Sequence, residues 1–374
     1  MISLRLAALV VAALLSPSTL HAAEPLGQVP GLVREATSVP FAPHGGAPLL
    51  LDALVTRPAG AGRFPLVVLS HGTPRDPADR AKTTASSTSA VAIEFARRGW
   101  AVVAVVRRGY GHSQGTYVES SGSCGHRNYR AAAHASAEDI GETVKFMARQ
   151  PYVDPGRVML AGVSAGGFAS IAAAAQPPPG IVAVLNFAGG RGSDAPDSVC
   201  DADALVAAFG ELGRTVRVPT LWFYAENDHF FGPTLAQRFF ASFTAAGGAG
   251  TFVKLPAFGA DGHMLLSQEG VALWRARVDT FLRQQNLPTW SKPVVEVAAD
   301  VPPPRSLSAS GRESFARYLA SGSFEKAFAA GATRGYGWAS GRRSTAEAKH
   351  EALETCTKNA PDCTVYAVNN ARAR

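Results

Sequence analysis

The sequence is short of charge, of cysteine and of long apolar runs, and each shortage excludes a class of protein. Only 17% of the 374 residues are charged, and the 36 basic residues are scattered among 29 acidic ones. Nucleic-acid-binding proteins usually gather basic side chains on one patch or stripe, so DNA and RNA are not expected partners. A mean hydropathy of +0.04 is too low for a multi-span membrane protein, and 47% hydrophobic residues are too many for a disordered chain.

Metal-binding motifs are also missing. The chain has no C-x-x-C and no H-E-x-x-H, and we expect neither a metal nor a cofactor. The four cysteines, Cys124, Cys200, Cys356 and Cys363, form the even set that indicates disulfides in an exported protein. Three pairings are possible, and we expect the local one, which joins Cys124 to Cys200 and Cys356 to Cys363.

The first 23 residues are typical of a secretory signal peptide. A short basic start is followed by the apolar run Leu6–Leu15 and then by the small, polar stretch Ser16–Ala23. The apolar run is about half as long as a membrane-spanning helix. We expect cleavage after Ala22 or Ala23 and a secreted or periplasmic protein without a membrane span; an uncleaved anchor is the alternative.

Short apolar runs alternate with helical segments through residues 24–287, which we expect to form one domain. Expected strands cover residues 49–55, 64–70, 101–106, 157–163, 181–187, 219–225 and 251–255. Expected helices cover residues 84–98, 136–150, 166–175, 233–246 and 267–284. Continuous apolar strands that alternate with helices predict an α/β fold, with a mostly parallel sheet covered on both faces.

The rest of the chain predicts a second, smaller unit. Residues 288–310 are rich in proline and are expected to form a linker. Residues 311–374 predict a small α+β domain, in which Ser344 and Glu347 form a capping box at the start of a helix. A core this small gains from a staple, which the Cys356–Cys363 bridge would supply.

Two G-x-S-x-G motifs occur, centred on Ser113 and Ser164. A nucleophile elbow needs a strand before the serine, small neighbours around it and a helix after it. Ser164 follows the apolar run VMLA and precedes an alanine-rich helical segment, whereas Ser113 is followed by TYVESSGSCG, which cannot form a helix. Ser164 is therefore the expected nucleophile, and Ser113 is expected to lie in a rim loop.

A serine nucleophile needs a base to take its proton and an acid to orient that base. In this topology the chain order is Ser, acid, His, and each partner follows a later strand. Asp228 follows the strand TLWFYA and His263 follows the next strand, so both meet this requirement. Glu226 as the acid and His229 as the base remain open alternatives.

An acyl-transfer site also needs N–H donors for the oxyanion. We expect one from the backbone of Ala165, at the start of the helix after Ser164. The second is expected from the backbone of Thr73, in the loop SHGT after the strand 64–70. His71 in the same loop is expected to shape the loop rather than to act as a base.

The ordered set SHGT, RRGYGHSQG, GVSAGG, YAENDHF and GADGH resembles the dienelactone-hydrolase-like branch of the α/β-hydrolase superfamily. It is also similar to the catalytic domain of prolyl-oligopeptidase-like peptidases, and the likeness covers about residues 40–285. The resemblance implies the roles given above for Ser164, Asp228, His263, Thr73 and Ala165. Dienelactone hydrolases carry Cys at the elbow, so their substrate is not carried over. The tail resembles a small exported bacterial domain of unknown function.

These features predict a secreted or periplasmic serine esterase for small soluble esters; a serine peptidase and a non-catalytic envelope-binding protein are the alternatives. Two long connections, residues 107–134 and 188–218, leave the edge of the sheet where ligands bind, and each holds one cysteine. A bridge between them would make a fixed wall and disfavour long-chain lipids. The expected pocket aromatics are Tyr110, Phe187, Phe230, Phe231 and Phe258. The partner of the C-terminal domain is unknown.

Overall fold

The computed structural model describes residues 26–43, 46–296 and 299–373. The predicted signal peptide, residues 1–23, lies outside the described residues. Among the described helices, none is long and apolar enough to cross a membrane.

The larger part of the chain is built on an eight-stranded sheet with the order β1-β2-β4-β3-β5-β6-β9-β10. Its strands are β1 (Leu32–Phe41), β2 (Leu49–Pro58), β3 (Phe64–Ser70), β4 (Ala101–Val105), β5 (Val153–Val163), β6 (Ile181–Phe187), β9 (Thr220–Ala225) and β10 (Gly250–Leu255). β2 runs antiparallel to both β1 and β4, and the other neighbours are parallel. The expected α/β architecture with a mostly parallel sheet is thus confirmed.

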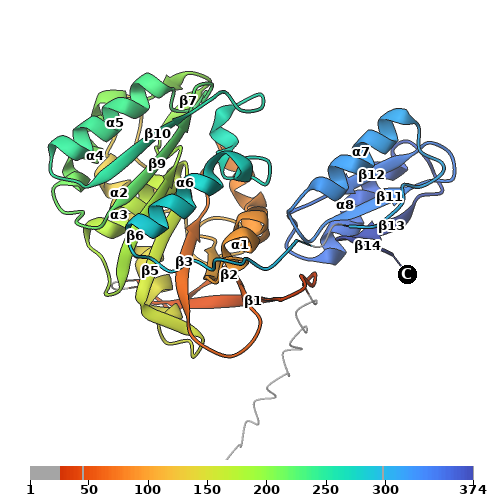
Figure 1. Ribbon diagram of the computed structural model, residues 1–374. Coiled ribbons are helices and arrows are strands. Elements are labelled where there is room, and N and C mark those ends of the chain that lie inside the picture. The colour runs from red at the N-terminus through yellow and green to blue at the C-terminus, as the bar shows by residue number, and fades with distance from the viewer. Residues whose placement is uncertain (1–25, 44–45, 297–298, 374) are drawn as a thin grey trace, which may run out of the picture.

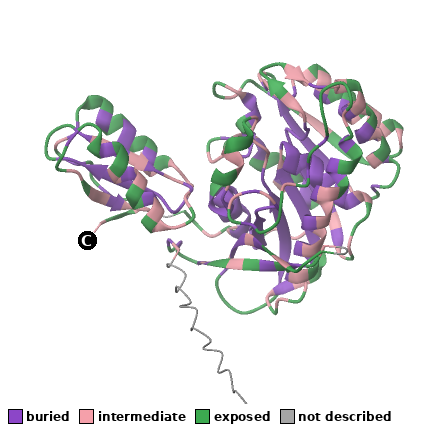
Figure 2. Ribbon diagram, turned by 180° about the vertical axis from the view of Figure 1, so that it is seen from behind, coloured by how far each residue is buried: buried purple, intermediate pink, exposed green. Residues whose placement is uncertain are grey.

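Helices cover both faces of this sheet (Figure 1). They are α1 (Ser89–Ala96), α2 (Tyr129–Met147), α3 (Ala165–Ala175), α4 (Ala202–Gly213), α5 (Pro233–Ala245) and α6 (Val271–Gln284). One apolar core joins the sheet to α2, α3, α4 and α5, and a second joins it to α1 and α6. The central strands are accordingly buried along most of their length (Figure 2).

Short elements complete this part of the chain and lie near the carboxyl edge of the sheet. They are the 3-10 helices η1 (Pro77–Lys82), η2 (Ala85–Thr88) and η3 (Gly262–Leu265), and the hairpin of β7 (Ser193–Ala195) with β8 (Ser198–Val199). The hairpin and α4 both lie inside the second long connection, which therefore has structure of its own.

Two differences from the sequence-based expectation have physical causes. β1 was not expected, because as an edge strand it buries few apolar side chains and carries Pro40 near its end. Helix α2 begins at Tyr129 rather than at 136, because the side chain of Asn128 caps it by accepting from the Ala131 N–H at 2.9 Å. The first turns of α2 contain small alanines and show no apolar stripe in the sequence.

The C-terminal region has its own antiparallel sheet with the order β12-β11-β13-β14. Its elements are α7 (Ala309–Ala320), β11 (Ala327–Ala330), β12 (Tyr336–Ala339), α8 (Thr345–Thr357), β13 (Thr364–Val368) and β14 (Ala371–Arg372). α7 packs on one side of β11 through Phe315 and Tyr318, and α8 packs on the other through Ala348 and Ala352. The Cys356–Cys363 disulfide ties α8 to the segment before β13, with 6.0 Å between the two Cα atoms.

A buried ion pair joins this C-terminal region to the central sheet. The guanidinium of Arg34, on β1, binds the Glu325 carboxylate through two hydrogen bonds of 2.9 and 2.8 Å, and both side chains are at most 1% exposed. The same carboxylate accepts from the Gly27 N–H. The neighbouring Phe324 packs into the core beneath α1, and its N–H donates to Ser89 Oγ at 3.1 Å. The two parts of the protein therefore share a buried contact.

We predict that Glu325→Ala destabilises the protein by about 3 to 5 kcal/mol, because it leaves the Arg34 charge buried without a partner. Urea denaturation at pH 7 measures the change. The control is Glu35→Ala, on β1 beside Arg34. The Glu35 side chain is 47% exposed where it pairs with Arg57, so the loss of this pair should cost about 1 kcal/mol or less. Equal destabilisation by the two variants would contradict this account of the junction.

Candidate active site

Ser164 lies on the turn between β5 and α3, with φ of 56° and ψ of −125°. A positive φ is uncommon for a residue with a side chain and costs conformational energy. Hydrogen bonds hold the turn on both sides: the Ser164 N–H donates to the Phe187 carbonyl at 3.0 Å, and the Ser164 carbonyl accepts from the Gly190 N–H at 3.1 Å. The turn places Ser164 at the carboxyl edge of the sheet, as a nucleophile elbow requires.

The neighbours of Ser164 are small because backbone passes close to them. A Cβ on Gly162 would lie 2.3 Å from the Gly166 carbonyl oxygen, and a Cβ on Gly166 would lie 2.2 Å from the Ser70 carbonyl oxygen. Neither side chain can be accommodated without moving β3 or α3. The G-x-S-x-G spacing at Ser164 therefore follows from the packing of the strand against the helix.

Asp228 and His263 meet beside the elbow. The carboxylate of Asp228 lies 3.1 and 3.2 Å from His263 Nδ1, and the two side chains are 0% and 6% exposed. Asp228 Oδ1 also accepts from the N–H groups of Phe230 and Phe231, each at 2.8 Å. The acid is thus fixed by its own loop and in turn fixes the imidazole.

The alternative acid and base are engaged elsewhere. Glu226 forms a half-exposed ion pair with Lys254 at 3.0 Å. The exposed ring of His229 binds the carboxylate of Asp197 at 2.9 Å, and this contact raises the pKa of His229. Geometry therefore favours Asp228 with His263 over either alternative.

Two aromatic rings connect His263 with the cavity that Ser164 lines. The Phe230 ring stacks on the imidazole, with 3.9 Å between centroids and 11° between planes, and Phe231 meets it edge-on at 5.5 Å. Both phenylalanines line the same cavity as Ser164. Of the expected triad, Ser164 therefore lines the cavity, and the His263–Asp228 pair lies behind the two phenylalanines that form part of its wall.

The two expected oxyanion donors also belong to this cavity, which Thr73 and Ala165 line next to Ser164. Ala165 is the first residue of α3, so its N–H has no acceptor within the helix. Neither the Thr73 nor the Ala165 N–H donates to another described residue. Both donors are therefore free to bind a developing negative charge.

Two other residues singled out in the sequence have structural contacts. His71 Nδ1 lies 2.7 Å from the Gly72 carbonyl oxygen, and its Nε2 accepts from the Arg107 N–H at 3.1 Å. Burial and the charge of Arg107 lower the pKa of His71 to about 3, so the ring is neutral and braces the loop. The Ser113 hydroxyl bridges β2 and β4, accepting from the Asp52 N–H and donating to the Val106 carbonyl.

A buried carboxylate, Glu119, organises the rim of the site. It is 1% exposed and forms ion pairs with Arg107 and with Arg191, the latter at 2.6 Å. It also accepts from the Tyr110 hydroxyl at 3.0 Å, and that hydroxyl lies 2.6 Å from Thr73 Oγ1. Both long connections and the loop of the expected oxyanion donor therefore meet at one carboxylate.

The arginines set the ionisation of Glu119. Burial alone would raise its pKa, but the charges and hydrogen bonds of Arg107 and Arg191 outweigh burial and hold the pKa well below its usual range. Arg107 continues the network to β3, donating to Ser70 Oγ and to the His71 carbonyl, each at 2.7 Å. Glu119 is therefore charged at neutral pH, and its carboxylate binds Arg107, Arg191 and the Tyr110 hydroxyl.

A disulfide joins the same two connections. Cys124 and Cys200 are paired, with Cα atoms 5.3 Å apart, which is the pairing expected from the sequence. The bridge closes a segment of 76 residues and could contribute roughly 4 kcal/mol in the chain-entropy model. The disulfide and the Glu119–Arg191 ion pair are thus two separate links between the long connections that form the rim.

The cavity beside Ser164 has a volume of about 330 Å³. Of the aromatic residues expected at the pocket, Phe230 and Phe231 line it, and three do not. Tyr110 is buried in the Glu119 network, and Phe187 is fully buried in the core and stacked on Phe223. Phe258 packs against the apolar core beneath η3.

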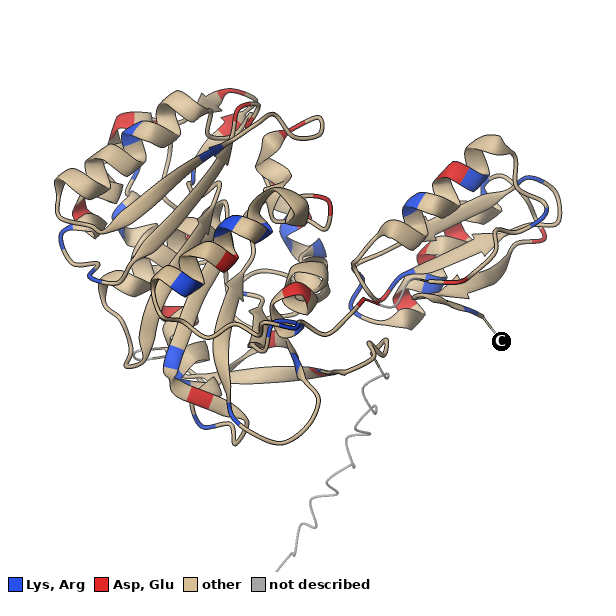
Figure 3. Ribbon diagram, in the orientation of Figure 1, with Lys and Arg blue, Asp and Glu red and all other residues tan. Residues whose placement is uncertain are grey.

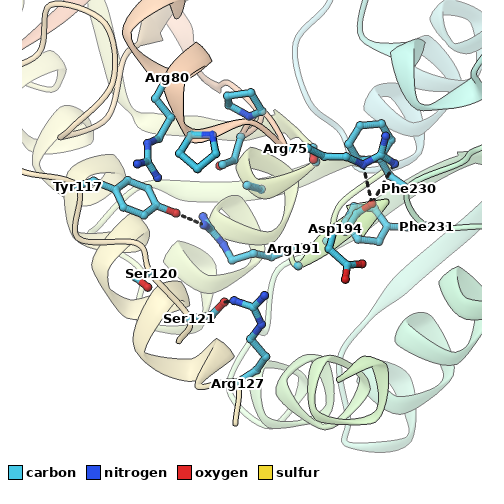
Figure 4. Close-up of a pocket in the computed structure, with 18 residues that line it drawn as sticks. Arg75, Arg80, Tyr117, Ser120, Ser121, Arg127, Arg191, Asp194, Phe230 and Phe231 are labelled. Atoms are coloured by element: carbon cyan, nitrogen blue, oxygen red, sulfur yellow. Dashed lines mark hydrogen bonds between the residues drawn. The ribbon is translucent and has the colours of Figure 1, made fainter. Parts of the chain in front are cut away.

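Sequence reasoning missed the basic side chains of this cavity. Arg75, Arg80, Arg127 and Arg191 line it (Figure 4). A signal was present, because Arg75 and Arg80 closely follow SHGT, and the other two lie in the long connections assigned to the rim. Their meeting depends on how three loops fold over the sheet, which sequence spacing alone does not give.

Comparison with protein families finds one match. The model of the family described as X-Pro dipeptidyl-peptidase (S15 family) matches residues 46–240, which is more than half of the chain. The matched region includes Ser164 and Asp228 and ends before His263. No curated protein matches the sequence.

Several solved structures are similar in fold. An esterase of Pyrococcus furiosus is 13% identical with a TM-score of 0.49, over 70% of this chain and 95% of that one. The acylaminoacyl peptidase of Pyrococcus horikoshii is 16% identical with a TM-score of 0.46, over 70% and 43%. A dienelactone hydrolase-like promiscuous phosphotriesterase from metagenomic libraries is 15% identical with a TM-score of 0.45, over 67% and 98%. These values assign no activity to the chain.

We predict that Glu119→Gln destabilises the protein by about 3 to 5 kcal/mol at pH 7, because two buried guanidinium groups lose their carboxylate. The pKa of Glu119 is lower in the folded than in the unfolded protein, so its stabilisation is present above the unfolded value of 4.5 and is lost as the pH falls through the folded value. The gap between wild type and variant should therefore be constant above about pH 5.5 and shrink below about pH 4.5.

Urea titrations across this pH range test the prediction. Glu142→Gln is the control, because it removes a carboxylate from an i,i+3 surface pair with Lys145. This variant should change the free energy of unfolding by about 1 kcal/mol or less. A gap for Glu119→Gln that widens on acidification would contradict the assignment.

Proposed function

Because the chain belongs to the X-Pro dipeptidyl-peptidase (S15) family of α/β-hydrolases, we propose that it is a serine hydrolase that cleaves small soluble carboxylic esters. Ser164 is the proposed nucleophile, His263 the base and Asp228 the acid. The observation that carries the proposal is the strained Ser164 turn on a cavity whose aromatic wall packs against a buried His263–Asp228 pair.

The proposed reaction begins at Ser164. Because Asp228 occupies His263 Nδ1, Nε2 is the nitrogen free to take the Ser164 Oγ proton. The oxygen then attacks the ester carbonyl carbon, and the oxyanion that forms accepts hydrogen bonds from the Thr73 and Ala165 N–H groups. The imidazolium returns the proton to the leaving alcohol, which departs as the C–O bond breaks and the acyl-enzyme forms. Water activated by His263 hydrolyses that intermediate and restores Ser164.

A small substrate fits the cavity. The cavity volume of about 330 Å³ is near the lower end of the range for ligand sites. The Cys124–Cys200 bridge and the Glu119 ion pairs fasten the rim, which favours a fixed wall over a lid that opens at a lipid surface. Short acyl chains are therefore the proposed substrates, in a secreted or periplasmic protein whose catalytic domain spans residues 24–287 and whose stapled domain spans residues 311–374.

A serine peptidase is the second candidate, and the family match favours it. The same nucleophile, base and oxyanion donors serve amide cleavage, so the site alone does not separate the two reactions. Hydrolysis of an X-Pro 4-nitroanilide, measured beside that of 4-nitrophenyl acetate, distinguishes them. A higher kcat/KM on the anilide would replace the esterase proposal with the peptidase one.

We expect Ser164→Ala to lower kcat on 4-nitrophenyl acetate by about 10⁴- to 10⁶-fold, because only binding and oxyanion effects remain. It should also abolish labelling by a fluorophosphonate probe. Ser113→Ala is the matched control in the other G-x-S-x-G motif; it loses two backbone hydrogen bonds but should keep its activity within a few-fold. Equal losses in both variants would refute the elbow assignment, and wild type that takes no label would indicate a non-catalytic protein.

We also expect no interfacial activation. The rate on a 4-nitrophenyl ester should fall as the acyl chain lengthens, because the fastened rim limits the cavity. Initial rates measured across the critical micelle concentration of the long-chain ester test this. A rate that rises sharply at that concentration would contradict the fixed-rim proposal.

A further inference from the structure

The geometry points to a negatively charged substrate. We infer that the ester cleaved at Ser164 also carries an ionised acidic group, and that Arg75, Arg80 and Arg127 bind this group. The inference rests on the proposed function, because it names the substrate class of that same site.

Three of the four arginines that line the cavity form no ion pair with a carboxylate among the described residues, whereas Arg191 pairs with Glu119. Arg75 donates to Ser193 Oγ and to the His229 carbonyl, which are neutral acceptors. Arg127 donates to Ser121 Oγ and to the Gly122 carbonyl. Both guanidinium groups are therefore held by neutral acceptors. A hydrogen bond from Ser198 and the charge of Arg127 lower the pKa of Asp194, so this one carboxylate offsets part of the Arg127 charge.

The third of these residues, Arg80, is held by an aromatic ring. Its guanidinium lies 4.0 Å from the centroid of Tyr117, which also lines the cavity. This contact holds the guanidinium over the ring but supplies no negative charge. Arg80 thus keeps hydrogen-bond donors for a ligand.

Acidic groups at the cavity are too few to compensate. Among the described residues that line the cavity, one is acidic, Asp194, and four are arginines. Glu119, buried behind the wall, is shared between Arg191 and Arg107, so that cluster also keeps an excess positive charge. Elsewhere basic and acidic residues are interspersed (Figure 3). A concave site lined by one sign of charge raises the local concentration of ligands of the opposite sign.

The positive charge lies next to the reacting groups. The guanidinium of Arg75 lies 3.4 Å from the centroid of the Phe230 ring, and that ring stacks on His263 at 3.9 Å. Arg75 and Thr73 lie on the same loop after β3, and Arg127 lies on the connection that the disulfide fastens. In Figure 4 Arg75 and Arg80 come from the connection after β3 and Arg127 comes from the connection after β4, and the three side chains lie around one hollow. A small substrate whose carbonyl meets Ser164 would therefore place an acidic group within their reach.

The positive charges of the cavity also disfavour an X-Pro peptide, the substrate that the family description indicates. A dipeptidyl-peptidase removes a dipeptide from a free amino terminus, which is a cation at neutral pH. A cavity with unpaired arginines repels that ammonium group. Arginine instead pairs with carboxylate or phosphate through parallel N–H donors. The electrostatics therefore favour an anionic ester over an X-Pro peptide.

A matched pair of esters tests the inference. Mono-4-nitrophenyl succinate carries a free carboxylate, and its methyl ester has the same chain without the charge. We expect wild type to cleave the anionic ester with a kcat/KM about 10- to 100-fold higher, the range expected for hydrogen bonds to a charged group. Adding 0.5 M NaCl should reduce this preference, because salt screens charges at an open site.

Arg127→Gln should lower the preference for the anionic ester by about tenfold. Arg130→Gln is the matched control, because Arg130 is exposed on the first turn of α2 and does not line this cavity. Inhibition of methyl-ester hydrolysis by succinate and by inorganic phosphate shows which acidic group is bound more tightly; either result supports an anion site.

The possible failures are distinguishable. If the methyl ester is cleaved as fast as the anionic ester, and neither succinate nor phosphate inhibits, the anion site is refuted while the hydrolase stands. If neither ester is cleaved and the fluorophosphonate probe does not label Ser164, the proposed function fails and the inference fails with it.

Discussion

The ion pairs of Glu119 are the contact on which the architecture of the site depends. This carboxylate sits where the ends of β3 and β4 meet both rim connections. Its partners Arg107 and Tyr110 lie in its own connection, and Arg191 lies in the other. Removing a charge from such a cluster costs more than the cluster contributes to stability, because the remaining charges stay buried. The network therefore specifies one arrangement of the rim. Thr73 takes its place in that arrangement through Tyr110.

Backbone groups hold the strained turn at Ser164, whereas side chains hold the imidazole of His263. The Ser164 turn is held by neighbouring strand and loop carbonyls and by two glycines that permit close approach. The imidazole is held by Asp228 and by two aromatic rings. None of these supports comes from the C-terminal region, whose polar contacts with the larger part of the chain include β1, β2, α1 and the loop before α1.

Much of the fold could be predicted, because its signals are local. The strands Phe64–Ser70 and Ile181–Phe187 lie where their continuous apolar runs indicate. The glycines around Ser164 are visible in one motif, and Asp228 and His263 follow from chain order. The edge strand β1 and the cavity arginines could not be predicted, because an edge strand buries little and a cavity is formed by loops remote in sequence. Phe187 shows the reverse error: its position beside a motif suggested a pocket, but its strand runs through the core.

The Arg34–Glu325 pair has a consequence for the order in which the protein folds. Its members are 291 positions apart, yet Arg34 lies on the first strand of the sheet. Closing so long a loop is slow compared with forming local helices and neighbouring strands. Until residue 325 reaches its place in the fold, Arg34 at the edge of the sheet lacks the Glu325 carboxylate. Strand β1, although early in the chain, therefore gains its buried ion pair only through a residue 291 positions later.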